Sequence, residues 1–164
     1  MLQRVQTIYL ALAFICIILL LNFPIFSITS TVNEIVTVSE FNAYGFQSSA
    51  IETESTAFYL LYIFMALFSL AGLFLYKKRK KQIQIVRLGL IVHILVAVGF
   101  LAFSLFGKTT LLNKLRETGI ENMDLKFDFG LGYYLLFISI AFLLLAVRGI
   151  RADEKLVKSL DRLR

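Results

Sequence analysis

The sequence has few of the residue types from which disulfide frameworks, metal centres and soluble active sites are built. It contains no tryptophan, one cysteine, one proline and one histidine among 164 residues. The single thiol, Cys16, lies within an apolar run, so it has no partner for a disulfide and no spacing that suits a metal. There is no glycine-rich phosphate loop, no pair of carboxylates on a helix and no Ser-His-Asp arrangement. The sequence therefore predicts no enzyme activity, no cofactor and no metal.

The chain is unusually rich in apolar residues. Acidic residues are missing from the interiors of its long apolar segments. Hydrophobic side chains make up 59% of the sequence, far more than in a soluble domain. They gather in four segments, each long enough to cross a hydrocarbon core about 30 Å thick. The net charge of +6 does not indicate nucleic-acid binding, because the basic residues stand at the ends of these segments. We predict one domain, 1–164, of an all-α membrane protein with spans at about 5–22, 57–76, 83–106 and 130–147.

The first apolar segment is expected to stay in the mature protein as a helix. It is longer than the apolar region of a typical signal peptide, and no small-x-small cleavage site follows it. We expect this helix to end near Asn22, because Pro24 has no amide hydrogen to donate.

Basic residues are distributed very unevenly along the chain. Lysine and arginine are absent from residues 24–56 and form an uninterrupted run at 77–81. Loops rich in these residues stay on the cytoplasmic side of a membrane. The resulting topology has 13 basic and 3 acidic residues inside, against 4 basic and 8 acidic residues outside. We therefore predict a multi-pass protein with both termini cytoplasmic, cytoplasmic segments at 77–82 and 148–164, and external segments at 23–56 and 107–129.

Strand patterns occur in both external segments. Residues 27–32 and 34–39 are rich in Ile, Val and Thr and are separated by a short polar break, which predicts a hairpin. Residues 123–129 alternate between apolar and charged side chains, as a half-buried strand does. An isolated strand is unstable, so we expect it to join the hairpin in a small three-stranded antiparallel sheet. Further turns are predicted at Tyr44-Gly45 and at Ser48-Ser49.

The second external segment also contains a helical pattern. Residues 109–118 carry leucines on one side and charged residues elsewhere, and Gly119 is placed to end such a helix. We expect Gly107 and Lys108 to close the third span before this short helix begins.

The tail is charged but periodic. Leu156, Leu160 and Leu163 recur at helical spacing, and Glu154 precedes Lys158 by four residues. This pattern predicts a cytoplasmic amphipathic C-terminal helix that lies against the membrane or a partner. The predicted fold is thus a four-transmembrane-helix bundle with a small external antiparallel β-sheet, and its layout resembles claudin-like proteins in architecture only.

His93 is the residue whose position most invites a functional hypothesis. It lies near the middle of the third predicted span, and an ionisable group at that depth is a functional candidate by default. Ser69 and Ser139 are expected at matching depth, where either hydroxyl could hydrogen-bond the imidazole. His93 also shares a face with Gly89 and Ala97, a spacing typical of close helix packing, so a structural contact is the alternative. The lack of Asp and Glu inside the spans argues against a coupled transporter.

The basic run between the second and third spans is expected to orient the protein and to contact anionic lipid headgroups. Each cationic side chain near a membrane surface adds about 1 kcal/mol of attraction to such lipids. Docking of an acidic partner is the alternative. The run consists of Lys77, Lys78, Arg79, Lys80 and Lys81.

The two ends of the chain carry the most specific motifs. Residues 3–7 have the pattern Gln-Arg-x-Gln-Thr, and residues 153–164 have the pattern Asp-Glu-x-Leu-Val-Lys-Ser-x-Asp-Arg-Leu-Arg. Together with the length and character of the whole chain, these motifs resemble a small four-helix inner-membrane family of Bacteroidota, domain of unknown function 4293. The resemblance implies a location in the cell inner membrane and implies no activity.

Both motifs fall on the predicted cytoplasmic face. Polar residues of the start could therefore lie near polar residues of the tail and form one composite surface. The alternative is that the N-terminal residues are simply solvated among the headgroups. The candidate interaction face consists of Gln3, Arg4, Gln6, Asp153, Glu154, Lys158, Asp161 and Arg162.

Three functional hypotheses follow. The first is an accessory or scaffold subunit of a larger inner-membrane assembly, in protein export or cell-envelope function. Its partners would be membrane lipids and other integral membrane proteins in a hetero-complex, not nucleic acid. The second is a protein that binds or transports a lipid or small molecule, which would need a cavity between the helices. The third is a membrane-interface enzyme that uses His93. We expect the first, because the chain is small, lacks recognisable chemistry and has a patterned tail.

Overall fold

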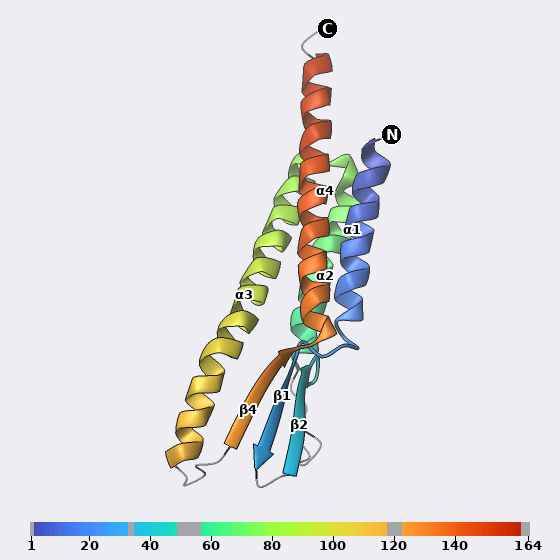
Figure 1. Cartoon of the computed structure of the whole chain (residues 1–164). Helices are drawn as coiled ribbons and strands as arrows, with labels where there is room; N and C mark the ends of the chain where they lie inside the picture. Colours follow the sequence, from blue (N-terminus) through green and yellow to red (C-terminus); the bar gives the residue numbers. More distant parts are fainter. Residues whose placement is uncertain (1, 33–34, 49–56, 118–122, 162–164) are drawn as a thin grey trace.

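Helices of apolar residues dominate the structure, a computed structural model that describes residues 2–32, 35–48, 57–117 and 123–161. The helices run roughly alongside one another, and a small sheet extends from one end of the bundle (Figure 1). We call this the sheet end, and we call the opposite end, where both termini lie, the termini end. The helices are α1 (Leu2–Leu19), α2 (Tyr59–Phe74), a 3₁₀ turn η1 (Leu75–Lys77), α3 (Arg79–Glu117) and α4 (Leu131–Asp161).

Three of the helices are long and apolar enough to cross a membrane. They occupy Tyr59–Lys77, Arg79–Gly107 and Leu131–Val157. The apolar helix Val5–Leu19 within α1 is shorter, and after it the chain turns at residues 20–22 and reaches Pro24. A mostly helical chain is therefore confirmed, with three helices that could span a membrane among the described residues.

The sheet is antiparallel and has the strand order β3-β2-β1-β4. The predicted hairpin and the predicted strand at 123–129 are confirmed, since β1 pairs with both β2 and β4. A fourth strand, β3, makes the predicted count of three strands wrong. The strands are β1 (Phe26–Val32), β2 (Ile35–Asn42), β3 (Gly45–Ser48) and β4 (Met123–Phe129).

The turn between β2 and β3 follows from local chemistry. Asn42 and Gly45 form the last cross-strand pair, so two residues connect the strands. Gly45 has a φ of 98°, a conformation that glycine adopts without steric cost. The side-chain oxygen of Asn42 accepts a hydrogen bond from the amide of Tyr44 at 2.9 Å. The predicted turn at Tyr44-Gly45 is correct, but it leads into a strand.

Helix α3 runs without a break through two predicted boundaries. The predicted loop at 77–82 is instead the end of η1, Lys78 and the first residues of α3. Gly107 and Lys108 do not close the helix, and the predicted separate helix at 109–118 is its continuation to Glu117. Glycine disfavours a helix by only about 1 kcal/mol relative to alanine, so one glycine need not end a long helix. Gly119 lies outside the described residues.

Helix α4 is likewise continuous, from the predicted span at 130–147 into the predicted tail. The tail is helical as expected. It does not form a separate helix, but continues along the axis of α4 beyond the N-terminal end of α1 (Figure 1). Residues 162–164 lie outside the described part.

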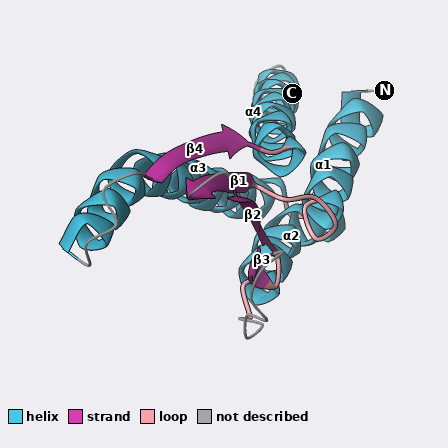
Figure 2. Ribbon diagram, turned by 60° about the horizontal axis from the view of Figure 1, so that its bottom comes forward, coloured by secondary structure: helices cyan, strands magenta, loops and turns pink. Residues whose placement is uncertain are grey.

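Two apolar cores hold the bundle together. Near the sheet end, Ile17 of α1, Tyr62 of α2 and Leu136 of α4 are buried in one cluster that also includes Phe26 and Phe41. Towards the termini end, a second cluster is formed by Leu10, Ala13, Ile83, Val86, Leu143, Ala146, Val147 and Ile150. Viewed from the sheet end, β4 lies beside α3 (Figure 2). The ring of Phe26 in β1 contacts Phe103 of α3, and the ring of Phe41 in β2 contacts Phe58 at the start of α2. The sheet therefore covers the space between α2 and α3.

Candidate functional site

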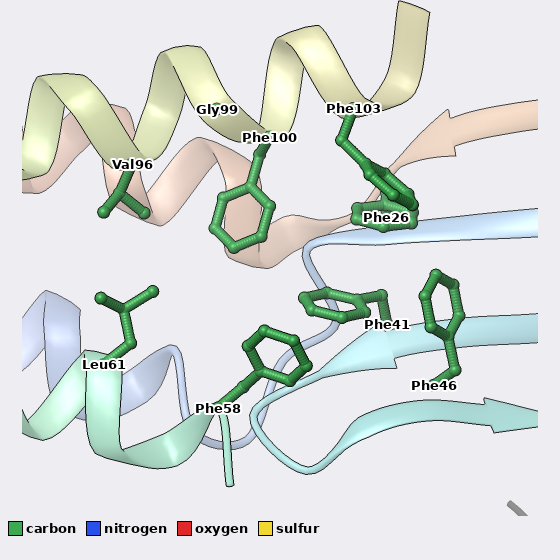
Figure 3. Close-up of a pocket in the computed structure, with 9 residues that line it drawn as sticks. All are labelled: Phe26, Phe41, Phe46, Phe58, Leu61, Val96, Gly99, Phe100 and Phe103. Atoms are coloured by element: carbon green, nitrogen blue, oxygen red, sulfur yellow. The ribbon is translucent and has the colours of Figure 1, made fainter. Parts of the chain in front are cut away.

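An apolar pocket of about 330 Å³ lies where the sheet meets α2 and α3 (Figure 3). Every side chain that lines it is apolar, and six of them are phenylalanines. We call it the Phe pocket. Its lining residues are Phe26, Phe41, Phe46, Phe58, Leu61, Val96, Gly99, Phe100 and Phe103.

Strand register places three of these phenylalanines side by side. Phe26 of β1 is the cross-strand partner of Phe41 in β2, and Phe41 is the partner of Phe46 in β3. Directly opposed residues of an antiparallel sheet point to the same face. The three rings therefore form one wall of the pocket (Figure 3).

Helical periodicity supplies the facing walls. The α3 residues recur at positions i, i+3, i+4 and i+7, which places them on one face of that helix. Phe58 and Leu61 stand three residues apart at the start of α2, so they also share a face. No local sequence pattern identifies this pocket, because its three walls come from segments far apart in the chain.

Contacts between the rings hold the walls in place. The centroid of the Phe41 ring lies 4.9 Å from that of Phe26 and 4.9 Å from that of Phe58. The Phe41 ring also lies 5.7 Å from Phe100, and the Phe26 ring lies 5.5 Å from Phe103. Such aromatic pairs add stabilisation beyond the burial of area. The pocket is therefore bounded by mutually supporting rings instead of by isolated mobile side chains.

Gly99 leaves part of the α3 wall open. An added Cβ at this position would meet no heavy atom within 4 Å. In contrast, a Cβ at Gly89 of the same helix would lie 2.6 Å from Cβ of Phe68. Close helix packing therefore requires glycine at position 89 but not at position 99.

A second candidate site lies at the termini end, where α1, α3 and α4 meet. Nε2 of Gln6 donates a hydrogen bond of 2.6 Å to Oδ2 of Asp153, and these two side chains are only 5% and 7% exposed. Nη1 of Arg79 donates to the backbone carbonyl oxygen of Asp153 at 3.4 Å. The close approach of Gln6 to α4 depends on Gly149, where a Cβ would lie 2.9 Å from Cγ of Gln6.

Two open cavities flank this contact. One, of about 540 Å³, is lined by Gln6 and Gln82 together with Thr7, Leu73, Phe74, Tyr76 and Arg79. Nε2 of Gln82 donates a hydrogen bond to the carbonyl oxygen of Gly72 at 2.9 Å, which holds this side chain against the backbone of α2. The other cavity, of about 530 Å³, is lined by Lys77, Lys78, Arg79, Lys80, Lys81, Glu154 and Val157.

The structure brings together part of the predicted interaction face. Gln6 contacts Asp153, Arg79 of the basic run reaches the same residue, and Glu154 lines the basic cavity. Gln3 and Arg4 lie in α1, and Lys158 and Asp161 lie in α4. The side chains of these four residues, and the whole of Arg162, lie outside the described part of the chain.

His93 lies in the bundle interior, but it does not pair with either predicted serine. Its Nδ1 lies 2.6 Å from the carbonyl oxygen of Gly89, so Nδ1 carries the donated proton. The hydroxyl of Ser139 donates to the carbonyl oxygen of Leu136 at 2.7 Å. Nε2 of His93, Oγ of Ser69 and the hydroxyl oxygen of Tyr62 are buried and have no hydrogen-bond partner among the described residues. The predicted hydrogen bond from His93 is therefore wrong.

The unpartnered hydroxyl of Tyr62 was not predicted. Tyr62 stands two helical turns before Ser69, which places both on one face of α2. The spacing was available in the sequence, but tyrosine in a membrane protein is most often expected near an interface, not in the bundle interior.

Among the described residues, no group of three or more His, Cys, Asp or Glu side chains could hold a metal ion.

Comparison with known protein families gives a match over nearly the whole chain. Residues 2–163 match the family described as Domain of unknown function (DUF4293). No curated protein matches the chain.

Proposed function

The chain belongs to the DUF4293 family, and from this premise we propose that it is a four-span protein of the cell inner membrane with both termini in the cytoplasm. Three long apolar helices support the proposal, and α1 packs along α4 and α2 in a position suited to a fourth span. Both termini and the basic run lie at one end of the bundle (Figure 1). Such a charge distribution favours a cytoplasmic location for that end.

We further propose that the protein is an accessory or scaffold subunit of a larger inner-membrane assembly, in protein export or cell-envelope function. The observation that carries this proposal is the continuation of α4 beyond its neighbours, next to a buried Gln6–Asp153 contact. Leu156 and Val157 are exposed on this extension. A helix that projects from the bundle with exposed apolar side chains offers a surface for another protein.

The proposal gives the protein no chemistry of its own. His93 is held by the backbone of its own helix, through the carbonyl oxygen of Gly89. We propose that this residue contributes to packing, as an intramembrane polar residue inside a bundle commonly does.

Blue-native electrophoresis of mildly solubilised native membranes tests the subunit proposal. We expect the protein to migrate in a complex larger than itself, and we expect Leu156→Lys with Val157→Lys to release it as a smaller species. The control is Val36→Lys, which places the same charge on an exposed residue of β2. Migration of the unmodified protein as a lone monomer would count against a subunit role.

A second candidate function is the binding of a lipid or another apolar molecule. The Phe pocket favours it, because binding of this kind needs a cavity that borders the helices. This function is compatible with a subunit role, since the pocket and the α4 extension lie at opposite ends of the bundle (Figure 1).

A further inference from the structure

We propose that the Phe pocket holds an acyl chain of a membrane phospholipid, which enters sideways between α2 and α3. This inference rests on the second candidate function and names its ligand. The pocket lies between the sheet and two helices that are both long and apolar enough to cross a membrane. At its rim, Phe58 and Phe103 are 40% and 46% exposed. In a membrane, the medium at that rim is lipid.

The chemistry of the lining selects a hydrocarbon. Among the described residues, no side chain that lines the pocket carries a hydrogen-bonding or charged group. A polar ligand would lose its hydrogen bonds to water and find no replacement, which is unfavourable. Water itself does not fill such a space well, since apolar cavities stay dry. A methylene chain gains burial and dispersion contacts without losing any hydrogen bond.

The size of the pocket separates a lipid chain from a protein partner. A volume of about 330 Å³ lies at the small end of ligand pockets. An α-helix with its side chains is roughly 10 Å across and would not fit into it. A single flexible hydrocarbon chain is narrow enough to pass between α2 and α3, and aromatic rings offer it a smooth apolar wall.

The surrounding surface provides a route for such a chain. Leu95 and Val98 of α3 are 64% and 55% exposed, and both are close in sequence to the lining residues Val96 and Gly99. Leu60 and Phe64 of α2 are also exposed. The outer faces of both helices are therefore apolar next to the pocket, and an acyl chain can leave the bilayer without crossing a polar surface.

Gly99 is the specificity-determining residue of this site. Gly99 stands in the middle of α3, among the residues that line the pocket. Close helix packing does not require glycine at this position, because a Cβ added at Gly99 would meet no heavy atom within 4 Å. Gly99 is exposed and lines the pocket, so a larger side chain there would narrow the opening through which the acyl chain enters. The glycine keeps the pocket open.

Photo-crosslinking tests the proposal on the full-length protein. The protein is reconstituted in vesicles of phosphatidylethanolamine and phosphatidylglycerol with a trace of phosphatidylethanolamine that carries a diazirine in one acyl chain. After irradiation, mass spectrometry locates the labelled residues. We expect more label on Val96, Phe100 and Phe103 than on the exposed residues Leu95 and Val98.

Variants separate a specific site from general contact with lipid. We expect Gly99→Leu to lower labelling of the pocket by about tenfold, since it removes the burial of several methylene groups. Leu61→Phe fills the same space from α2 and should also lower the labelling of the pocket. Val98→Leu is the matched control, because it enlarges an exposed neighbour, and it should leave the pocket labelling unchanged. Helix content and a monodisperse elution peak show that each variant is folded.

The outcomes distinguish this proposal from the function on which it rests. Even labelling of pocket and exposed residues, or full labelling of the pocket in folded Gly99→Leu, overturns the acyl-chain site. A small aryl diazirine added from solution provides the second arm. If it labels the pocket while the phospholipid does not, apolar-ligand binding stands and the acyl chain is the wrong ligand. If neither probe labels the pocket, both proposals fail.

Discussion

Gly89 and Gly99 lie on the same helix in opposite surroundings. A Cβ at Gly89 would lie 2.6 Å from Cβ of Phe68, an atom fixed to the backbone of α2, whereas a Cβ at Gly99 meets open space. We expect Gly89→Ala to lower the free energy of unfolding by about 1–3 kcal/mol through overpacking. We expect Gly99→Ala to raise it by up to about 1 kcal/mol through helix propensity. Thermal unfolding in detergent measures both, and shifts of the same sign would contradict the packing described for α3.

Ser69 and Ser139 are both buried, but only one of them has a partner. The hydroxyl of Ser139 donates to the carbonyl oxygen of Leu136, while Oγ of Ser69 has no partner among the described residues. Removal of an unsatisfied buried hydroxyl relieves a cost of about 1–3 kcal/mol. We therefore expect Ser69→Ala to raise the unfolding temperature and Ser139→Ala, the control, to lower it slightly. A loss of stability in Ser69→Ala would mean that a water molecule or a ligand satisfies this hydroxyl.

At the scale of elements, the Gln6–Asp153 contact joins α1 to α4. Replacing Gln6 by leucine leaves the buried Asp153 carboxyl group without its side-chain partner, which should cost about 1–3 kcal/mol of stability. The double variant Gln6→Leu with Asp153→Leu should recover most of that loss, because both polar groups are then gone. Gln84→Leu, on an exposed position of α3, is the control and should have little effect.

A double-mutant cycle gives the strength of this contact directly. If the effects of Gln6→Leu and Asp153→Leu simply add, the two side chains are not coupled. The hydrogen bond would then contribute nothing to the junction of α1 and α4, contrary to the geometry at the termini end.

Sequence patterns predicted the elements better than their ends. Alternation in residues 123–129 and β-branched residues in 27–39 identified three strands correctly. The helix ends expected at Gly107 and after Val147 were wrong, since α3 and α4 continue past both positions. A change from apolar to charged residues changes the surroundings that suit a helix, but it does not end the helix's backbone hydrogen bonds. Strand β3 was missed since four residues are too few to establish alternation.

The two candidate sites differ in how far the sequence could indicate them. Motifs at the chain ends suggested that Gln6 and Asp153 could meet, and the structure joins them by a hydrogen bond. No motif indicated the Phe pocket, because the strand register that aligns Phe26, Phe41 and Phe46 exists only after the sheet has formed. Spacing on a single helix could not reveal the other walls. Long-range pairing, which a local pattern does not encode, creates this pocket.

At the scale of the whole molecule, the two ends of the bundle have different characters. The termini end carries the basic run and the buried Gln6–Asp153 contact, and the sheet end carries the Phe pocket. The proposed topology places the first end in the cytoplasm and the second outside it. A protein of this layout would meet its partners at the cytoplasmic surface and a lipid chain at the outer end of its spans, next to the bilayer.

The described apolar helix of α1 is shorter than the other three, so the side on which the N-terminus lies tests whether α1 crosses the membrane. If α1 did not cross the membrane while the other three helices did, the N-terminus would lie on the opposite side from the C-terminus. Single cysteines can decide this, since Cys16 is the only native thiol and can be replaced by alanine.

The most direct measurement is therefore the labelling of single cysteines by a membrane-impermeant maleimide in right-side-out membrane vesicles. The cysteines are placed before Met1, at Val36 in β2 and at Ser159 in the α4 extension. We predict that Val36→Cys is labelled at once, and that the cysteines before Met1 and at Ser159 are labelled only after detergent opens the vesicles. Immediate labelling of the cysteine before Met1, or of Ser159→Cys, would contradict the four-span topology.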